Sequence, residues 1–122
     1  MAVVNALSTG NWSSVLVFPV PPGAGDTVHA NTFTVTLDQD ITVVSINTTA
    51  GGVGSAGGTF VISSTAARVI NANIVSGTTD CLTFTTGAIG GSCTVNGNAT
   101  GGASANADGI FVASTVTPYN LT

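Results

Sequence analysis

Four short β-prone segments, each containing one phenylalanine, recur along the chain and limit its fold more than any other feature of the sequence. The segments are 32–36, 59–63, 83–87 and 110–114. A second β-prone segment follows each of the first three, at 44–47, 69–73 and 94–98. A repeat of about 20–30 residues with two or three short strands is typical of one coil of a solenoid. The sequence therefore predicts an all-β fold, a short parallel β-solenoid (β-helix) of about three to four coils.

The repeat also predicts which side chains stack. In a parallel solenoid, equivalent residues of successive coils lie about 4.8 Å apart. The expected interior ladder consists of Phe33, Phe60, Phe84 and Phe111. Because successive side chains of a strand point to opposite faces, the alternation in 32–37 places phenylalanine inward and threonine outward. A second ladder, of side-chain amides that bond one another, is expected to contain Asn47, Asn71 and Asn96.

The composition favours strands over helices. The chain has 122 residues, of which 43% are hydrophobic, and it contains neither Lys nor Glu. Lys and Glu are among the residues that fill exposed helical faces, whereas Thr, Val and Ile favour strands. A β-sandwich or jelly roll stays open as an alternative, because it also uses short strands and glycine turns. Asn-Gly hairpin turns between alternating segments are scarce, and this favours the solenoid.

The segment 1–25 differs from the repeats. It ends in the proline- and glycine-rich run 19–25, which neither a helix nor a central strand can contain. Positions 15–18 are predicted to form one short strand before that run. The sequence thus predicts an N-terminal arm or cap at 1–25 and a β-solenoid domain at 26–122.

A short solenoid leaves a row of unpaired backbone groups at each end. Such edges invite pairing with another chain unless they are covered. We therefore expect the N-terminal segment to cover one end, and an oligomer partner or the C-terminal tail to cover the other. Association into a homo-oligomer is thus expected. Trp12 and Phe18 are the candidate contacts with a partner, because large aromatic side chains often anchor interfaces. Packing of the same two side chains over the end of the core is the alternative.

The charge balance excludes two classes of partner. The net charge is −4 and there is a single basic residue among Lys and Arg. Such a chain cannot neutralise a phosphate backbone or bind an anionic membrane, so we expect neither nucleic-acid nor membrane binding. Positions 1–7 have no basic region and no long apolar run, and no secretory signal is predicted. Cys81 and Cys93 are expected to be free thiols, although the sequence alone leaves one disulfide open.

No catalytic, cofactor-binding or metal-binding residue is predicted, and the chain is not expected to be an enzyme. Asp38 and Asp40 are spaced as in a polar turn, and a calcium loop would need more oxygen ligands and a bidentate acid. Asp26 and His29 could be drawn with one of many serines as a triad. No Gly-x-Ser-x-Gly segment supports that chemistry.

Segments 10–12, 22–28, 33–43 and 94–102 resemble β-helical virion structural proteins of tailed bacteriophages and bacterial adhesins. The resemblance covers most of the chain through short motifs. It implies a head decoration (cement) protein, a fibre or spike of the virion, or a surface adhesin. The chain departs from the fibre and adhesin pattern because it is short and has no separate attachment domain or long shaft.

The function expected from these features is that of a bacteriophage virion structural protein. The first expectation is an oligomeric capsid decoration protein that stabilises the head, with a trimer as the candidate stoichiometry. Its partners would be the major capsid protein or other virion proteins, and it would be made in the host cytoplasm. The alternative is a receptor- or glycan-binding module of a tail fibre, spike or adhesin. A tailspike glycosidase ranks third, because the chain has few acidic residues.

Overall fold

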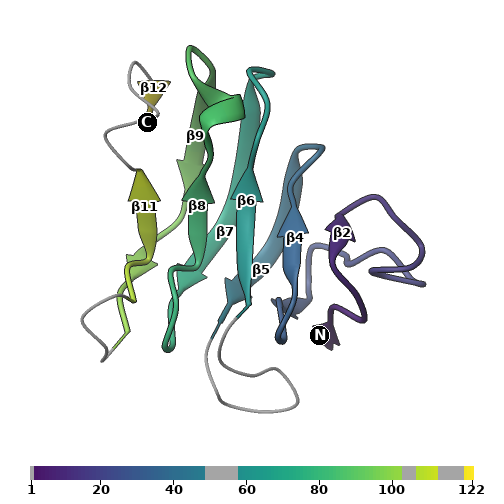
Figure 1. The fold of residues 1–122 in the computed structure, drawn as a ribbon. Coiled ribbons are helices and arrows are strands. Elements are labelled where there is room, and N and C mark those ends of the chain that lie inside the picture. The colour runs from purple at the N-terminus through teal and green to yellow at the C-terminus, as the bar shows by residue number, and fades with distance from the viewer. Residues whose placement is uncertain (1, 49–57, 103–106, 113–119) are drawn as a thin grey trace.

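The described strands form two parallel sheets that lie face to face as two layers (Figure 1). The computed structural model describes residues 2–48, 58–102, 107–112 and 120–122. One sheet, here called sheet A, contains β1 (Val3–Asn5), β3 (Thr27–His29), β5 (Ile41–Asn47), β7 (Arg68–Val75), β9 (Ser92–Asn96), β10 (Ala99–Thr100) and β12 (Asn120–Leu121). Sheet B contains β2 (Gly10–Asn11), β4 (Thr34–Thr36), β6 (Thr59–Ile62), β8 (Leu82–Phe84) and β11 (Ile110–Val112). A short 3-10 helix, η1, spans Thr86–Ala88.

The chain passes from sheet A to sheet B and back in each coil. In space the strands of each sheet follow their order along the chain, except that β10 pairs with the end of β7, as β9 pairs with its beginning. Every pairing between described strands is parallel. Parallel neighbours joined by a full turn through the opposite sheet define a β-solenoid, here of about four turns. The predicted fold class is therefore confirmed.

The predicted boundary after Gly25 does not separate the cap from the solenoid. β1 pairs with β3 through Val3↔Thr27, and β2 pairs with β4 through Gly10↔Val35. The first coil thus begins inside the segment predicted as an arm. Of the positions 15–18 predicted as a strand, 15–17 form a turn and Phe18 follows it outside any strand. The loop between β2 and β3 lies outside the two sheets, because its prolines lack the N–H groups that a sheet needs.

Two inward rows of sheet B fill the interior from one side. The first row contains Val35, Phe60, Leu82 and Ile110, which are aligned across β4, β6, β8 and β11. The second contains Ile62, Phe84 and Val112. They meet the inward side chains of sheet A, among which Val28, Ile46, Ile70 and Ile74 are fully buried. The core is therefore an aliphatic stack with aromatic members in different rows.

The predicted four-phenylalanine ladder is wrong in register. Phe60 and Phe84 are buried, but Phe60 pairs with Val35 and Leu82, and Phe84 pairs with Ile62. Phe33 lies before β4 and is only partly buried against the core. Phe111 pairs with Thr83 and is 38% exposed.

Unequal coil lengths explain this result. In the row that contains Phe60, the aligned residue of β8 is Leu82 and that of β11 is Ile110. Phe84 comes two positions after Leu82, and this even offset returns its side chain to the inward face. Phe111 comes one position after Ile110. An odd offset places a side chain on the opposite face of the strand, so Phe111 points outward.

The asparagine ladder is confirmed for two of its three predicted members. Asn71 and Asn96 are aligned, and Asn96 Nδ2 donates to Asn71 Oδ1 at 2.8 Å. Asn71 Nδ2 in turn donates to Thr42 Oγ1 at 3.1 Å, so a threonine begins the ladder. The inclusion of Asn47 is wrong, because that residue is aligned with His29 and Val75. The misplacement follows from the length of the coil: Thr42 is the residue of β5 that aligns with Asn71, so this coil is longer than the separation of Asn47 and Asn71 in the sequence.

The different positions of two phenylalanines predict different costs of truncation. Phe60→Ala removes a ring that is fully buried, and we expect it to lower the free energy of unfolding by about 3–5 kcal/mol. Phe111→Ala removes an outward ring and should cost less than about 1 kcal/mol. Urea unfolding followed by circular dichroism measures both. If the two substitutions lowered the free energy of unfolding equally, Phe60 and Phe111 would be equivalent core residues, as the sequence repeat suggests, and the prediction would be contradicted.

Gly97, between β9 and β10, lets two coils approach closely. A Cβ added there would lie 2.0 Å from the carbonyl oxygen of Ala72 and 2.6 Å from its carbonyl carbon. We expect Gly97→Ala to lower the free energy of unfolding by about 1–3 kcal/mol, because the obstructing atoms belong to the backbone. Gly23→Ala is the matched control, since its nearest neighbour would be Asp26 Oδ2 at 3.7 Å. Thermal unfolding of the two variants measures the difference, and equal melting temperatures would contradict the prediction.

Candidate interaction surface

Trp12 and Phe18 close the N-terminal end of the core. Their ring centroids lie 5.0 Å apart at 60°, and Trp12 lies 6.2 Å from Phe60. Trp12 is 4% exposed and Phe18 is 2% exposed. Of the two alternatives that the sequence leaves open, the structure shows the core cap, and little of either side chain remains exposed. The first coil leaves apolar side chains of the core uncovered at the N-terminal end, and packing the two rings over them buries both the rings and the core.

The backbone beyond β2 turns back on itself to place the two rings. Trp12 N donates to Thr36 O at 2.8 Å, which extends the ladder of β2 by one residue. The N–H groups of Val17 and Phe18 both donate to Ser14 O at 3.0 Å, so the chain turns sharply there. Leu7 N donates to Val17 O at 3.1 Å and fixes the turn against the first coil. Val17 is fully buried beside Phe18.

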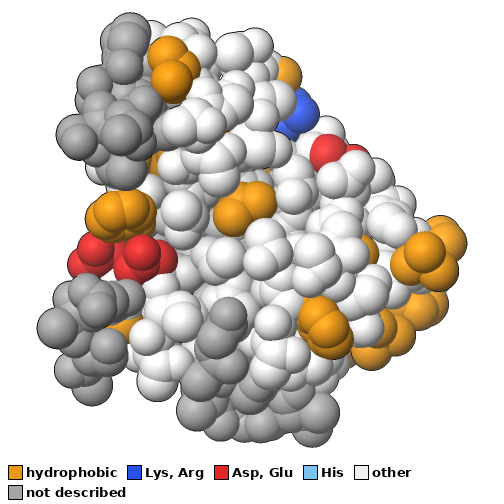
Figure 2. Space-filling view, in the orientation of Figure 1, with side chains coloured by type: hydrophobic (Ala, Val, Ile, Leu, Met, Phe, Trp, Pro, Cys, Tyr) orange, Lys and Arg blue, Asp and Glu red, His pale blue; other side chains and the backbone are white. Residues whose placement is uncertain are grey.

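This turn and the segments on either side of it expose apolar side chains that the sequence analysis did not single out. Leu7, Val15, Leu16 and Val20 are 59%, 69%, 75% and 76% exposed, and we call these four residues the cap surface. Figure 2 shows hydrophobic side chains gathered at the right-hand edge, where Figure 1 draws the loop after β2. A signal was present in the sequence. Four apolar residues in succession at 15–18 cannot all enter a core from one turn, so some of them must face water.

Carboxylates tie one coil to the next. Asp26 accepts hydrogen bonds from Ala2 N at 3.2 Å and Gly23 N at 2.8 Å. Asp38 accepts from both the N–H (3.1 Å) and the hydroxyl of Ser13.

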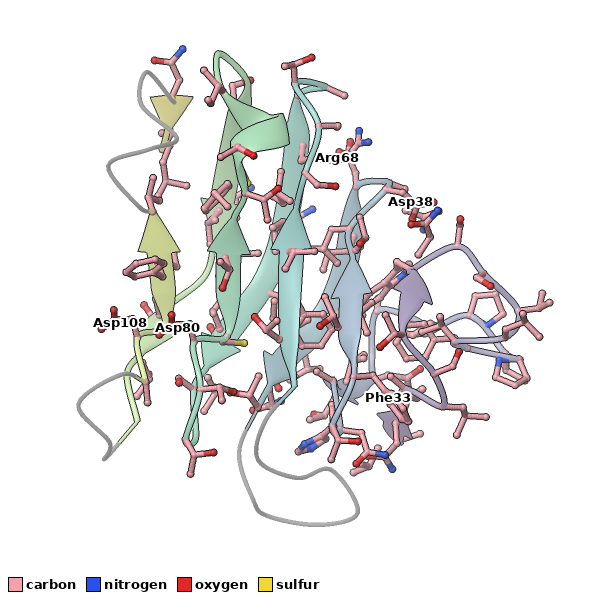
Figure 3. All side chains as sticks on the ribbon, viewed as in Figure 1. Phe33, Asp38, Arg68, Asp80 and Asp108 are labelled. Atoms are coloured by element: carbon pink, nitrogen blue, oxygen red, sulfur yellow. The ribbon has the colours of Figure 1, made fainter. Side chains whose placement is uncertain are left out.

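Two further carboxylates make ties of the same kind. Asp40 Oδ1 accepts from Val69 N at 2.8 Å, and Asp80 Oδ1 accepts from Asp108 N at 2.9 Å. Figure 3 shows Asp80 and Asp108 as neighbours beside β8 and β11. Because these oxygens already accept backbone hydrogen bonds, a structural role is the simplest account of the Asp38 and Asp40 pair.

Arg68 lies at the same edge of the solenoid as Asp38 (Figure 3). Its Nε donates to Leu37 O at 3.3 Å, and its Nη2 donates to Asp38 O at 3.1 Å. The guanidinium therefore caps carbonyl groups at the turn between β4 and β5. Five donors in a fixed fork suit this task better than the point charge of a lysine.

The two cysteines are free and buried. Burial raises the pKa of the Cys81 thiol to about 12. Burial, together with the nearby carboxylate of Asp40, raises the pKa of Cys93 to about 11, against the opposing effect of Arg68. Both groups are protonated thiols near neutral pH and act as small apolar side chains. The expectation of free thiols is confirmed.

His29 follows the inward-facing Val28 in β3, so its side chain lies on the opposite face of sheet A. It is nevertheless buried. It is aligned with Asn5 in β1 and with Asn47 in β5, both uncharged. His29 is 5% exposed, and neither its Nδ1 nor the Oδ1 of Asn5 has a hydrogen-bond partner. The carboxylate of Asp26 bonds to backbone groups of Ala2 and Gly23, so the triad drawn from the sequence gains no support from its hydrogen bonds.

Three features are absent from the part of the chain that the structure describes. No pocket opens on its surface, and no three residues among His, Cys, Asp and Glu lie together as metal ligands would. Within residues 2–48, 58–102, 107–112 and 120–122, no helix has the length and apolar character needed to cross a membrane. The most distinctive surface feature is therefore the cap surface. Comparison with protein-family models, with curated proteins and with solved structures finds no match.

The buried imidazole predicts a stability that depends on pH. Burial lowers the pKa of His29 below its ordinary value of 6.5. As the pH falls below about 6.5, the imidazole of His29 becomes protonated in the unfolded chain but stays neutral in the folded chain. The free energy of unfolding therefore decreases. Urea midpoints measured from neutral to mildly acidic pH should show this loss. His29→Asn, which matches its neighbours Asn5 and Asn47, should flatten the dependence, and an unchanged slope would contradict the prediction.

Proposed function

We propose that the protein is a virion structural protein of a tailed bacteriophage, an oligomeric capsid decoration protein that stabilises the head. The observation that carries the proposal is the cap surface, a group of large apolar side chains held outward at one end of a short solenoid. Contiguous apolar surface on a soluble domain commonly marks a site of protein interaction. The resemblance of the sequence to β-helical phage proteins gives that interaction its setting.

The construction of the chain supports a structural role. Four of its five carboxylates and its arginine bind backbone groups within the solenoid. Most of the charged side chains of the protein are thus engaged in joining the coils. A part that works by being packed against neighbours needs a rigid body and an apolar contact surface, and the chain has both.

One observation favours a second candidate, a receptor- or glycan-binding module of a tail fibre, spike or adhesin. Phe111 is an exposed aromatic ring, and it is aligned with Thr83 on the outward face of sheet B. Sugars commonly stack on exposed aromatic side chains beside hydroxyl groups. The proposal ranks this candidate second because a single ring is a small platform.

Quantitative mass spectrometry of purified particles tests the proposal. A decoration protein is expected in many copies, in a fixed ratio to the major capsid protein, and immunogold labelling should place it over the head. Adding the purified protein to heads that lack it should raise the temperature at which they release DNA. A few copies at the tail, together with binding to a glycan array that Phe111→Ala abolishes, would overturn the proposal in favour of the second candidate.

A further inference from the structure

One asparagine of the chain is followed directly by glycine, in the pair Asn96-Gly97. Every other asparagine precedes alanine, threonine, tryptophan, isoleucine or leucine. Asparagine is a thermally labile residue, because its side-chain amide can be attacked by the backbone nitrogen of the next residue. A glycine in that next position has no Cβ to obstruct the approach. The chemistry of the pair therefore singles out Asn96 for modification.

The structure leaves the pair accessible. Asn96 is the last residue of β9, and both Asn96 and Gly97 are exposed at the bend before β10. Among the described residues, none accepts a hydrogen bond from Gly97 N. Asn71, the neighbour of Asn96 in the ladder, is instead followed by Ala72 inside β7, a strand that pairs with β5 and β9. The nitrogen that follows Asn96 is thus not held by another coil.

We propose that Asn96 is a site of spontaneous deamidation in the folded protein, and that isoaspartate is the product that alters the structure. Gly97 N attacks Cγ of Asn96, so that the N–Cγ bond forms and the Cγ–Nδ2 bond breaks. Ammonia leaves with the proton of the Gly97 N–H, and a cyclic imide remains. The reaction does not depend on the proposed function.

Water completes the reaction in one of two ways. It adds a hydroxyl group to one carbonyl carbon of the imide and returns a proton to Gly97 N. If the N–Cγ bond breaks, the product is aspartate. If the bond between Gly97 N and the main-chain carbonyl carbon of Asn96 breaks, the product is isoaspartate. One water molecule is consumed and one ammonia is released in total, and no oxidant is needed.

The asparagine ladder can accommodate aspartate at position 96. An ionised carboxylate only accepts hydrogen bonds, so it cannot donate to Asn71 Oδ1 as Asn96 Nδ2 does. The amide of Asn71 can turn over, because its other partner is the hydroxyl of Thr42, which donates as well as accepts. Asn71 Nδ2 then donates to residue 96, and Asn71 Oδ1 accepts from Thr42. The ladder is kept with its direction reversed.

Isoaspartate has no such solution. The main chain then runs through the former side-chain carbons, so one additional carbon atom enters the backbone just before Gly97. Gly97 lies so close to the neighbouring coil that an added Cβ would meet Ala72 O at 2.0 Å. Beyond it, Asn98 O accepts from Ile74 N at 2.8 Å, and β10 pairs with the end of β7. A longer backbone shifts these contacts out of register, and we expect β10 to lose its pairing.

Mass spectrometry of the folded protein, incubated at mildly alkaline pH, tests the site. Cleavage after Arg68 releases the fragment 69–122. Fragmentation of this peptide should place the replacement of an amide by an acid at Asn96, and electron-transfer fragments distinguish isoaspartate from aspartate. Asn98 is the internal control, because it is also exposed but precedes alanine. Asn96 should convert at least about tenfold faster, which corresponds to a barrier lower by about 1.4 kcal/mol.

Two variants test the structural consequence. Asn96→Thr removes the amide and keeps a side chain that favours strands, so its urea midpoint should not change during incubation. Incubated wild-type protein should contain a fraction with a lower midpoint, equal to its isoaspartate content and with faster hydrogen exchange in β10. Asn96→Asp, measured before incubation, should unfold near the wild-type midpoint, which separates the added charge from the longer backbone. Circular dichroism confirms that each variant is folded.

Three results would overturn the proposal. Conversion of Asn96 only in urea-unfolded protein would mean that the fold protects the amide. Equal rates at Asn96 and Asn98 would mean that the glycine and its free N–H have no effect. Wild-type protein that contains isoaspartate but unfolds as Asn96→Thr does would remove the structural consequence. None of these results depends on whether the protein is found on phage heads.

Discussion

The parallel register between successive coils is the constraint on which the rest of the structure depends. Each strand is fixed to its neighbours by backbone hydrogen bonds, so the length of a coil decides which side chain lies over which. A change of one residue moves a side chain from the interior to solvent. Phe111 is outward and Phe60 is inward for this reason alone, although both stand in similar local sequences. Turns and the irregularity in β5 absorb the differences in coil length while the register within the strands is kept.

The scarcity of charge follows from the same architecture. In a stack of parallel coils, like positions recur at about 4.8 Å, and a repeated charged residue would face its own kind in the next coil. Threonine and asparagine avoid this repulsion and can bond between coils, as Asn71 and Asn96 do. The few carboxylates present lie at turns, where backbone N–H groups of an adjacent coil need acceptors. Asp40 and Asp80 thus compensate at corners for ladder bonds that the bends interrupt.

Local pattern and repeat length suffice to predict the class of fold, because a regular solenoid-like period and the absence of helix-forming Lys and Glu admit few architectures. The register between neighbouring strands cannot be predicted, because it depends on the number of residues in each turn. The sequence of a glycine-rich turn does not indicate where the turn begins and ends. Asn47 is misplaced for that reason. The prediction of a separate N-terminal arm is wrong, because β1 and β2 already belong to the two sheets. The prolines at 19, 21 and 22 suggested a boundary where the structure has only a loop between two strands of the solenoid. The sequence leaves Trp12 and Phe18 open between a partner contact and a core cap, and their burial next to Phe60 identifies the cap.

The N-terminal end of the solenoid shows how closing the core produces exposed apolar surface. A cap must be apolar on its inner side to finish the core, and a short turn has too few residues to be apolar on one side only. Val17 and Phe18 cannot be turned inward without carrying Val15 and Leu16 outward, because the hydrogen bonds to Ser14 O and from Leu7 N fix the path of the turn. The exposed surface is therefore a geometric consequence of closing the core with an uncharged hydrophobic run. The turn that closes the core at this end therefore also carries the exposed apolar side chains of Val15 and Leu16.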